Sequence, residues 1–468
     1  MNWIRDELPY SVDPFAWFAS VRDRPWPVIL ESRGCSGQRF DIIAADPAII
    51  ISARDDVTTV AKQGREYTSN LDPFSVVQQE VADRQPDEPC PVDSVFTGGA
   101  IGYFGYELAR HVERLPEPPV NDLDMPDMLV GIYDWFIVID HLSGRAMVLS
   151  SPRRSKAEHD SLRRQLDTVA GTGLKPFSAG PVSSNFSRQQ YNAAVKRIKS
   201  YIFAGDCYQV NLAQRFMARF EGDPVALYQT LRNCHTAPFS ACLAFPGHQV
   251  LSFSPERFLR VRDGDVLTEP IKGTRSRGET KAEDERLAQE LMVSEKDKAE
   301  NLMIVDLLRN DLGRCCEPGS IHVESLFQLR SFPNVHHLVS AVRGHLRAGQ
   351  SAIDLLKACF PGGSITGAPK VRAMEIIREL EPARRYAYCG AIGYYDYNGN
   401  MDTNLAIRTI VCGNGQVCFW GGGGIVADST ADAEYQESLD KVNMIARAIS
   451  PDSNNFDRIN GAAQDQHG

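Results

Sequence analysis

The sequence predicts an α+β fold. Segments with the alternation of strands and segments with helical periodicity are mixed along the 468 residues, without the strict strand–helix alternation of a doubly wound sheet. Apolar and polar residues alternate over 250–253 and again over 266–268, and the turn-forming run Arg-Asp-Gly-Asp at 262–265 lies between them. This pattern predicts two adjacent antiparallel strands joined by a turn.

The composition is that of a globular protein without a membrane or nucleic-acid signature. Hydrophobic residues make up 43% of the chain and charged residues 24%, and the apolar run 128–138 is broken by Asp134. The net charge is -10 with no basic cluster, so an anionic substrate would have to be held by locally placed cations. The 11 cysteines lack Cys-x-x-Cys spacing, and charged residues 5–7 interrupt any signal peptide, which predicts a cytoplasmic protein.

A change of composition divides the chain. Between residues 150 and 186 a charged stretch gives way to a run rich in Gly, Pro and Ser. We therefore expect one region over 1–180, a second over 186–450, and a polar, disordered tail over 451–468.

Two predicted helices carry acidic pairs. Ser294 precedes a helix that ends at Gly313, and Asp297 and Glu300 share one of its faces. A second helix follows residues 428–429, with Glu434, Glu437 and Lys441 on one face and Tyr435, Leu439, Val442 and Ile445 on the buried face. Two carboxylate pairs suit a hard cation such as Mg²⁺, although two solvated acidic faces are the alternative.

A carboxylate and an amine lie close to the predicted strand pair. Glu256 follows the first strand, and Lys272 stands between Ile271 and Gly273 after the second. On a hairpin the two side chains can converge on one pocket, while an ion pair on a solvated sheet face is the alternative.

A series of motifs, in the same order along almost the whole chain, resembles the chorismate-utilising enzymes. They are Arg-Phe-Asp-Ile at 39–42 with Ala-Asp-Pro at 45–47, Gly-Gly-Ala-Ile-Gly-Tyr-Phe-Gly-Tyr at 98–106, Gly-Asp-Cys-Tyr-Gln-Val-Asn-Leu at 205–212, the run 300–313, Phe-Pro-Gly-Gly-Ser-Ile-Thr-Gly-Ala-Pro-Lys at 360–370, and Gly-Gly-Gly-Gly-Ile-Val-Ala-Asp-Ser at 421–429. The resemblance implies a four-layer α/β/β/α core of two packed antiparallel sheets with outer helices.

The resemblance also assigns residues to the reaction. Lys272 matches a nucleophile that attacks the chorismate ring, and Glu256 matches its acid–base partner. Glu300 and Glu437 match direct Mg²⁺ ligands, with Asp297 and Glu434 nearby. Both catalytic groups would need shifted pKa values, the lysine downward and the glutamate upward.

Further residues match the substrate pocket. Arg408 matches the arginine that clamps a carboxylate, with Tyr388 as its hydrogen-bonding companion. Gly422, Gly423 and Gly424 precede the second helix, where their amides can meet an anion. The remaining matches are Lys441, Thr274, Ser364, His337 and Gln209. From the residues alone, His337 is equally a core histidine and Ser364 a turn residue.

Two positions separate the branches of the family. Anthranilate synthases have alanine where this chain has Lys272, so the lysine favours the aminodeoxychorismate branch. Isochorismate and salicylate synthases place a basic lysine where this chain has Gln209, and an amide cannot activate water by accepting its proton. The expected activity is amination of chorismate by ammonia. Anthranilate synthase component I and a catalytically silent, amino-acid-sensing relative are the alternatives.

The source of ammonia and one further ligand complete the expectations. The chain lacks the Gly-x-Cys-x-Gly elbow of a glutamine amidotransferase, so the resemblance implies a separate glutaminase subunit as partner. Leu30, Glu31 and Ser32 resemble a tryptophan-binding motif, and an ordinary strand end is the alternative.

Overall fold

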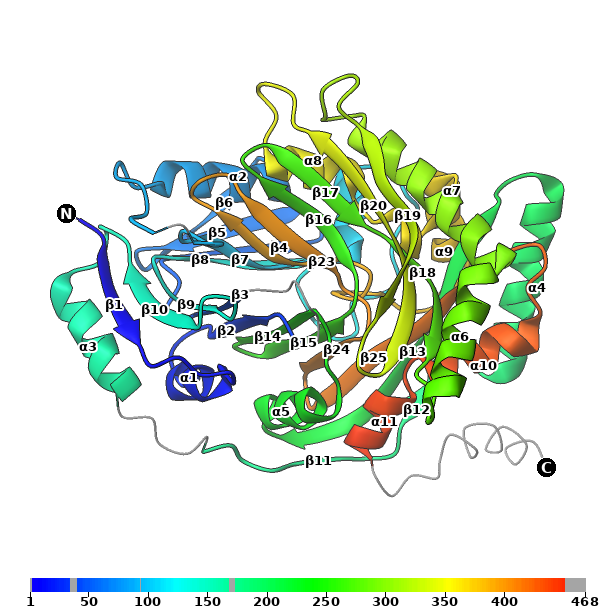
Figure 1. Ribbon diagram of the computed structural model, residues 1–468, viewed down its shortest axis with the longest axis horizontal. Coiled ribbons are helices and arrows are strands. Elements are labelled where there is room, and N and C mark those ends of the chain that lie inside the picture. The colour runs from blue at the N-terminus through cyan, green and yellow to red at the C-terminus, as the bar shows by residue number, and fades with distance from the viewer. Residues whose placement is uncertain (1, 34–39, 93, 168–172, 451–468) are drawn as a thin grey trace.

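The computed structural model describes residues 2–33, 40–92, 94–167 and 173–450. Two large sheets, A and B, form its centre (Figure 1). In sheet A the strand order is β1 (Ile4–Leu8), β10 (Arg145–Ser150), β9 (Trp135–Asp140), β3 (Phe40–Ala44), β2 (Val28–Glu31), β14 (Phe239–Phe245), β15 (His248–Ser254), β24 (Thr409–Gly413), β25 (Gln416–Ile425), β13 (Gln209–Gly222) and β11 (Phe177–Ala179), with β12 (Ser183–Ser184) and β21 (Gly367–Ala368) also paired to β13.

Sheet B is of similar size. Its order is β18 (Ile271–Ser276), β20 (Val335–His345), β17 (Asp265–Glu269), β16 (Arg257–Arg262), β23 (Met401–Leu405), β22 (Ala391–Asp396), β7 (Gly99–Phe104), β8 (Met128–Tyr133), β4 (Ile49–Arg54), β5 (Val57–Lys62) and β6 (Arg65–Ser69), with β19 (His322–Ser331) paired to β20. The named strands pair antiparallel in both sheets, as at β7–β22 and β13–β25.

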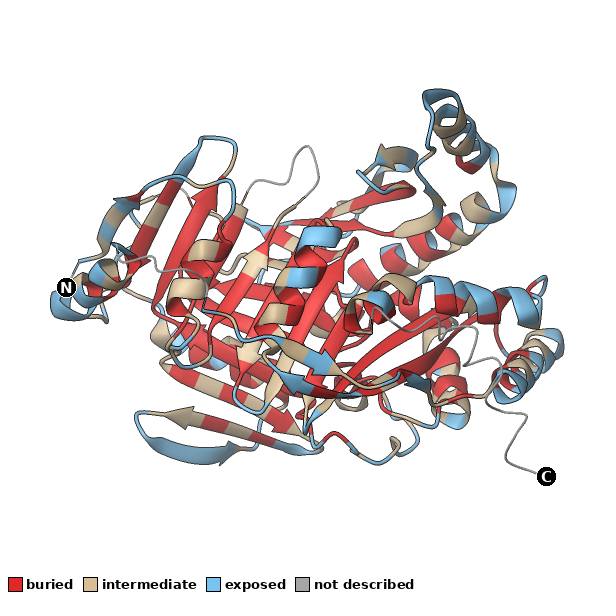
Figure 2. Cartoon of the chain, turned by 90° about the horizontal axis from the view of Figure 1, so that it is seen from below, coloured by how far each residue is buried: buried red, intermediate tan, exposed pale blue. Residues whose placement is uncertain are grey.

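Helices cover the sheets. On sheet A lie α4 (Arg188–Ala204), α5 (Pro224–Cys234), α9 (Lys370–Leu380) and α10 (Ala431–Asp440); on sheet B lie α2 (Pro73–Arg84), α6 (Lys281–Val293) and α7 (Glu295–Leu312). Packed on these or on each other are α1 (Phe15–Val21), α3 (Lys156–Asp167), α8 (Ala352–Cys359) and α11 (Asn443–Ile449), and the short 3₁₀ turns are η1 (Tyr106–His111) and η2 (Gly363–Ile365). Buried residues concentrate in the strands between these layers (Figure 2). The predicted α+β fold of two antiparallel sheets with outer helices is confirmed.

The regions 1–180 and 186–450 share both sheets. Strand β2 pairs with β14 in sheet A, and β7 pairs with β22 in sheet B, so each sheet contains strands from both regions. A single buried apolar cluster extends through both. The two regions are therefore parts of one folded body, and the predicted tail 451–468 lies outside the described residues.

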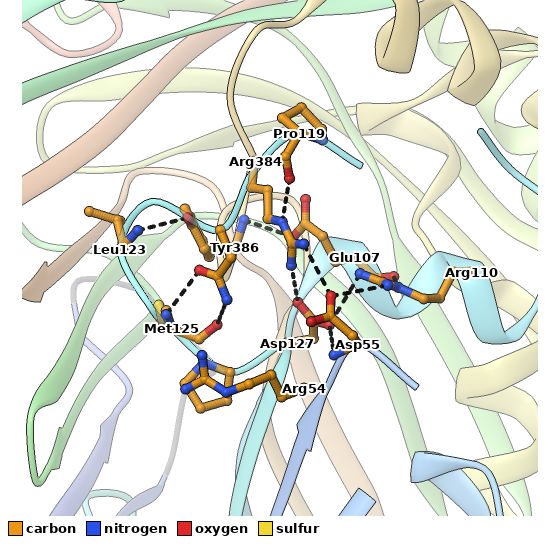
Figure 3. A network of polar contacts seen from close by, with 12 residues as sticks. Arg54, Asp55, Glu107, Arg110, Pro119, Leu123, Met125, Asp127, Arg384 and Tyr386 are labelled. Atoms are coloured by element: carbon orange, nitrogen blue, oxygen red, sulfur yellow. Dashed lines mark hydrogen bonds and ion pairs between the residues drawn. The ribbon is translucent and has the colours of Figure 1, made fainter. Parts of the chain in front are cut away.

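Polar contacts also join the two regions (Figure 3). Arg384 donates to Asp127 at 3.3 Å and to Asp55 at 3.1 Å. The carboxylate of Glu107 accepts the backbone N–H groups of residues 385–386 at 3.1 and 2.9 Å. Burial, and then the neighbouring Glu107 charge, raise the pKa of Asp127 to about 6. These contacts fix the segment that leads into β22.

The predicted strand pairing is wrong in one respect. Residues 250–253 belong to β15 in sheet A, whereas 266–268 belong to β17 in sheet B. The hairpin around 262–265 is formed by β16 and β17, with Asp263 and Gly264 at positive φ. Alternation identifies a strand but does not tell to which of two stacked sheets it belongs.

The two predicted acidic helices differ in outcome. Helix α7 begins at Glu295, after the N-cap Ser294 whose hydroxyl accepts the N–H of Asp297, and it ends before Gly313 as predicted. In place of the second predicted helix the structure has two helices, because α10 ends at Asp440 and α11 begins at Asn443. Its predicted buried residues, Tyr435, Leu439, Val442 and Ile445, are buried. No helix in the described part of the chain is long and apolar enough to cross a membrane.

Candidate active site

The site lies where the chain crosses between the sheets. Residues 255–256 connect β15 in sheet A to β16 in sheet B, and residues 406–408 connect β23 in sheet B to β24 in sheet A. The two crossings are hydrogen-bonded to each other, since the N–H of Leu405 donates to the Glu256 carbonyl at 3.0 Å and the Ser254 hydroxyl donates to the Leu405 carbonyl at 2.6 Å. Glu256 and Arg408 are therefore held on adjacent connections.

Ser364 links the two predicted catalytic groups. Its hydroxyl donates to Glu256 Oε1 at 2.9 Å, and its carbonyl accepts from Lys272 Nζ at 3.2 Å. Glu256 is only 5% exposed, and Lys272 is half-buried. The pair therefore meets in an enclosed site and not on a solvated sheet face. Ser364 lies in η2, so it is in a turn, but it also orients both groups.

Burial shifts the pKa of each predicted catalytic group in the direction that favours its uncharged form. It raises the pKa of Glu256 to about 7, against the opposing effects of the Ser364 hydrogen bond and the Lys272 charge. Burial also lowers the pKa of Lys272, against the opposing charges of Glu300 and Glu256. Both shifts favour the neutral forms, a protonated acid beside a free amine, which is the combination that nucleophilic attack with acid assistance requires.

Carboxylates from α7 and α10 approach the same space. A Cβ on Gly423 of β25 would lie 3.0 Å from Glu434 Oε2 and 3.6 Å from Glu437 Oε1. Burial raises the pKa of Glu300, and the charges of Asp297 and Glu437 raise it further. The acidic groups of the two helices therefore lie close enough to repel each other.

The acidic set fits Mg²⁺ in donor type but is not a preformed cage. Within the described residues, no group of three or more His, Cys, Asp or Glu side chains could by itself hold a metal ion. Lys441 Nζ lies 2.7 Å from Glu437 Oε1, and Lys296 Nζ lies 3.9 Å from Glu300 Oε1. The two ammonium groups thus offset the negative charge of Glu437 and Glu300, as a hydrated divalent ion would also do.

The other predicted members of the acidic set are held by protein groups. Arg275 contacts Asp297 at 3.3 Å, and the Ser429 hydroxyl donates to Glu434 Oε1 at 2.7 Å. Both are therefore already oriented, whereas Glu437 has half of its side chain exposed.

Arg408 is a half-buried cation that forms no ion pair with an acidic side chain of the described residues. Its backbone has φ +50°, and burial, the one cause of its shift, lowers its pKa. Among the described residues no carboxylate forms an ion pair with its guanidinium. Tyr388 is buried in the 385–390 turn and stacks on Trp420 with centroids 5.7 Å apart, and among the described residues the side-chain hydrogen bond of Arg408 goes to His235 and not to Tyr388 as expected. An uncompensated guanidinium in a closed site is suited to bind a ligand carboxylate.

Two further predicted residues have unsatisfied buried polar atoms. His337 Nδ1 contacts the Thr274 hydroxyl at 2.8 Å, but its Nε2 has no hydrogen-bond partner among the described residues. Burial and then the Arg408 charge lower the pKa of His337 to about 3, so the ring is neutral. Within the part of the chain that the structure describes, both amide atoms of Gln209 also lack a hydrogen-bond partner, and a Cβ on Gly424 would lie 2.8 Å from its Nε2. Such groups mark positions where a ligand or water completes the hydrogen bonding.

The predicted position of the glycines at a helix start is wrong, while their binding of substrate stays a prediction. Gly422, Gly423 and Gly424 lie within β25, paired with residues 211–213 of β13, and α10 begins only at Ala431. Their amides therefore belong to a strand. The Gly422 carbonyl accepts from Lys441 at 2.8 Å, and the small size of Gly423 and Gly424 leaves room for Glu434 and Gln209.

Leu30, Glu31 and Ser32 line a separate cavity of about 280 Å³ between the sheets. The Glu31 carboxylate is bound by Arg232 at 2.6 Å and by the Tyr228 hydroxyl at 2.5 Å. Glu31 is thus held in place at the end of β2, and binding of tryptophan there stays a prediction. Neither Glu256 nor Lys272 lines this cavity.

Sequence reasoning missed two residues of the site. His235 Nε2 accepts from Arg408 Nη1 at 3.4 Å, and Trp420 supports Tyr388 by stacking. His235 stands in no motif with a chemical signature, and Trp420 directly precedes the 421–429 motif, whose position was the available signal for it.

The fold and this arrangement of acid, amine and unpaired arginine define a chorismate-binding enzyme. The family described as chorismate binding enzyme matches residues 27–447, and the chain belongs to it. The chain is 46% identical to aminodeoxychorismate synthase component 1 of Klebsiella aerogenes over 449 residues, which covers 94% of this chain and 98% of that protein. It is 39% identical to anthranilate synthase component 1 of Pseudomonas aeruginosa, with 93% of each chain covered.

A solved structure agrees with this assignment. Anthranilate synthase component I from Streptococcus pneumoniae TIGR4 superposes with a TM-score of 0.79 at 33% identity, covering 88% of this chain and 93% of that chain.

Proposed function

We propose that this protein is the chorismate-aminating component of an aminodeoxychorismate synthase, a transferase that converts chorismate and ammonia to 4-amino-4-deoxychorismate. The observation that carries the proposal is the contact of Lys272 and Glu256 with the same residue, Ser364. The 46% identity to a component 1 of that enzyme supports the same conclusion.

The chemistry proceeds through a covalent bond to Lys272. Its neutral amine attacks ring carbon 2 while Glu256, in its acid form, protonates the hydroxyl on carbon 4, which leaves as water as the ring double bonds shift. Ammonia then forms a bond to carbon 4, the double bonds shift back, and the bond between carbon 2 and the lysine breaks. Glu256 accepts the proton that the incoming ammonia loses. The raised pKa of Glu256, about 7, supports both of its roles.

The remaining residues hold the substrate and exclude water as the nucleophile. Arg408 binds a substrate carboxylate through its guanidinium, which forms no ion pair with a carboxylate of the described residues. Gln209 and His337 offer polar atoms to the substrate, and the Gln209 amide cannot activate water by accepting its proton. Glu300 and Glu437 would hold Mg²⁺, with Asp297 and Glu434 behind them. When bound, the ion stabilises the charge that builds up on the ring carboxylate.

The proposed supply of nitrogen is a partner subunit. The amino-acid sequence has no Gly-x-Cys-x-Gly elbow, so glutamine hydrolysis is assigned to a glutamine amidotransferase that forms a heterodimer with this chain in the cytoplasm. The product keeps its enolpyruvyl ether, so a separate lyase must follow to yield 4-aminobenzoate for folate synthesis. The cavity at Leu30–Ser32 is assigned to bound tryptophan, without a regulatory role.

One experiment tests the assignment. The purified chain is incubated with chorismate, Mg²⁺ and an ammonium salt at alkaline pH, where ammonia is abundant, and the product is identified by mass. We expect 4-amino-4-deoxychorismate with ammonium and no turnover with glutamine until a glutaminase subunit is added. A 2-amino product would assign the chain to the anthranilate synthases instead, and glutamine-dependent turnover by the single chain would contradict the need for a partner.

A further inference from the structure

The surroundings of the half-buried Arg408 differ from those of the fully buried arginines. Arg232 is bound to Glu31 at 2.6 Å, and Arg385 is bound to Glu381 at 2.6 Å. For Arg408, the described residues supply a different partner, the imidazole of His235, whose Nε2 lies 3.4 Å from Nη1. The long contact leaves the full charge of the guanidinium available.

His235 is itself fixed in position. It is the residue after α5, and its N–H donates to the Leu231 carbonyl at 2.8 Å. Its ring is 8% exposed and packs edge-on against Phe253, with centroids 6.2 Å apart. The N–H of Phe253 in turn donates to the Arg408 carbonyl at 3.1 Å. Phe253 therefore contacts both the histidine ring and the backbone of the arginine.

The imidazole is an uncharged acceptor. Burial, and then the Arg408 charge, lower the pKa of His235 to about 4, so the ring is neutral at physiological pH. A guanidinium only donates, so Nε2 carries the lone pair and the ring proton is on Nδ1. A carboxylate in the same place would also hold the arginine, but it would neutralise the charge on which attraction of an anionic ligand depends.

We propose that His235 is a positioning residue that orients Arg408 through a neutral hydrogen bond and so preserves its positive charge for the substrate carboxylate. The proposal rests on the proposed function, in which Arg408 binds a carboxylate of chorismate. It predicts that the residue at position 235 sets substrate affinity according to its charge as well as its hydrogen-bonding capacity.

Three variants separate these properties in the ammonia-dependent assay. Asparagine at 235 keeps a neutral acceptor, alanine removes it, and aspartate replaces it with a charged one. We expect His235→Asn to raise the KM for chorismate by no more than about threefold, His235→Ala by about tenfold, and His235→Asp by about thirtyfold or more, with kcat within about twofold in each. The melting temperature of each variant reports folding, and His345→Ala, at an exposed histidine that contacts Asp265, serves as the matched control.

Parallel measurements on Arg408→Ala distinguish the role of His235 from the binding of the substrate carboxylate by Arg408. A raised KM in Arg408→Ala with an unchanged KM in His235→Ala would overturn the role of His235 alone. An aspartate variant no weaker than the alanine variant would overturn the argument from charge. An unchanged KM in both Arg408→Ala and His235→Ala would remove the carboxylate clamp itself, and with it this proposal, while the identity of the reaction product would still decide the proposed function.

Discussion

Replacing Glu256 by glutamine is expected to stabilise the protein at alkaline pH while it removes the activity. Glu256 is 5% exposed, and its pKa of about 7 lies above its ordinary value of 4.5 because burial disfavours the charged form. At pH 8 the folded protein therefore holds a buried carboxylate that would be better solvated in the unfolded chain. Glutamine has nearly the same shape, accepts the same hydrogen bond from Ser364, and never carries the charge.

The size and the pH range of the effect follow from the two pKa values. Below about pH 4.5 the carboxyl is protonated in both states and has no effect on stability. As the pH rises from 4.5 to about 7, the unfolded chain loses the proton first, so the wild-type protein loses stability. Above pH 7 the loss is complete and amounts to about 3 kcal/mol, at about 1.4 kcal/mol for each pH unit between the two values. With an unfolding entropy of about 1 kcal/mol/K for a chain of this length, the melting temperature shifts by about 3 °C.

Thermal unfolding at two pH values tests this calculation. We expect Glu256→Gln to melt about 3 °C above the wild type at pH 8 and less than about 1 °C above it at pH 5. Glu221→Gln, at the exposed end of β13, is the control and should shift neither value. Equal melting temperatures of the variant and the wild type at pH 8 would refute the reasoning, because the buried charge would then cost no stability. A difference of the same size at both pH values would also refute it, because the gain would then come from packing.

Three other outcomes are expected. Lys272→Ala should reduce formation of the 4-amino product by several powers of ten, and a substrate analogue should label Lys272 in the wild type, as peptide mass spectrometry would show; undiminished product would contradict the covalent route. Glu300→Gln or Glu437→Gln should lower activity at least about a hundredfold and raise the Mg²⁺ concentration needed, measured by metal titration, whereas a wild-type titration curve would exclude that ligand. Gly424→Ala should reduce activity about tenfold or more with little change in melting temperature, because its Cβ would lie 2.8 Å from Gln209 Nε2 and displace that side chain; full activity would show that Gln209 is not needed in place.

Capping residues and motifs made much of the fold and site predictable. Ser294 and Gly313 mark both ends of α7, because caps and terminating residues act locally. Lys272, Glu256 and Ser364 converge as the motif resemblance implied. The reason for their convergence was not predictable from alternation, since Glu256 lies on a crossing between sheets and not on a hairpin with β17.

Contacts between distant segments account for what the sequence did not indicate. The sequence predicts that the glycines 422–424 precede a helix, yet pairing with β13 makes them part of a strand. Here pairing between distant strands outweighs the low strand propensity of glycine. His235 and Trp420 enter the site because α5 and β25 deliver them there. The break between α10 and α11 at residues 441–442 likewise has no proline or glycine to announce it.

The order of strands in the two sheets determines when the chain can fold during synthesis. In sheet A, β24 and β25 separate β15 from β13, and in sheet B, β22 and β23 join β16 to β7. Neither sheet is continuous until residues 391–425 have been made. At about 5 to 20 residues per second, the roughly 290 residues between β7 and β22 take roughly 15 to 60 s to emerge, and throughout that time finished strands wait with an unpaired edge. A chain interrupted before β22 would leave those edges open to pairing with other chains, so the nascent protein depends on protection from aggregation until its last strands are inserted.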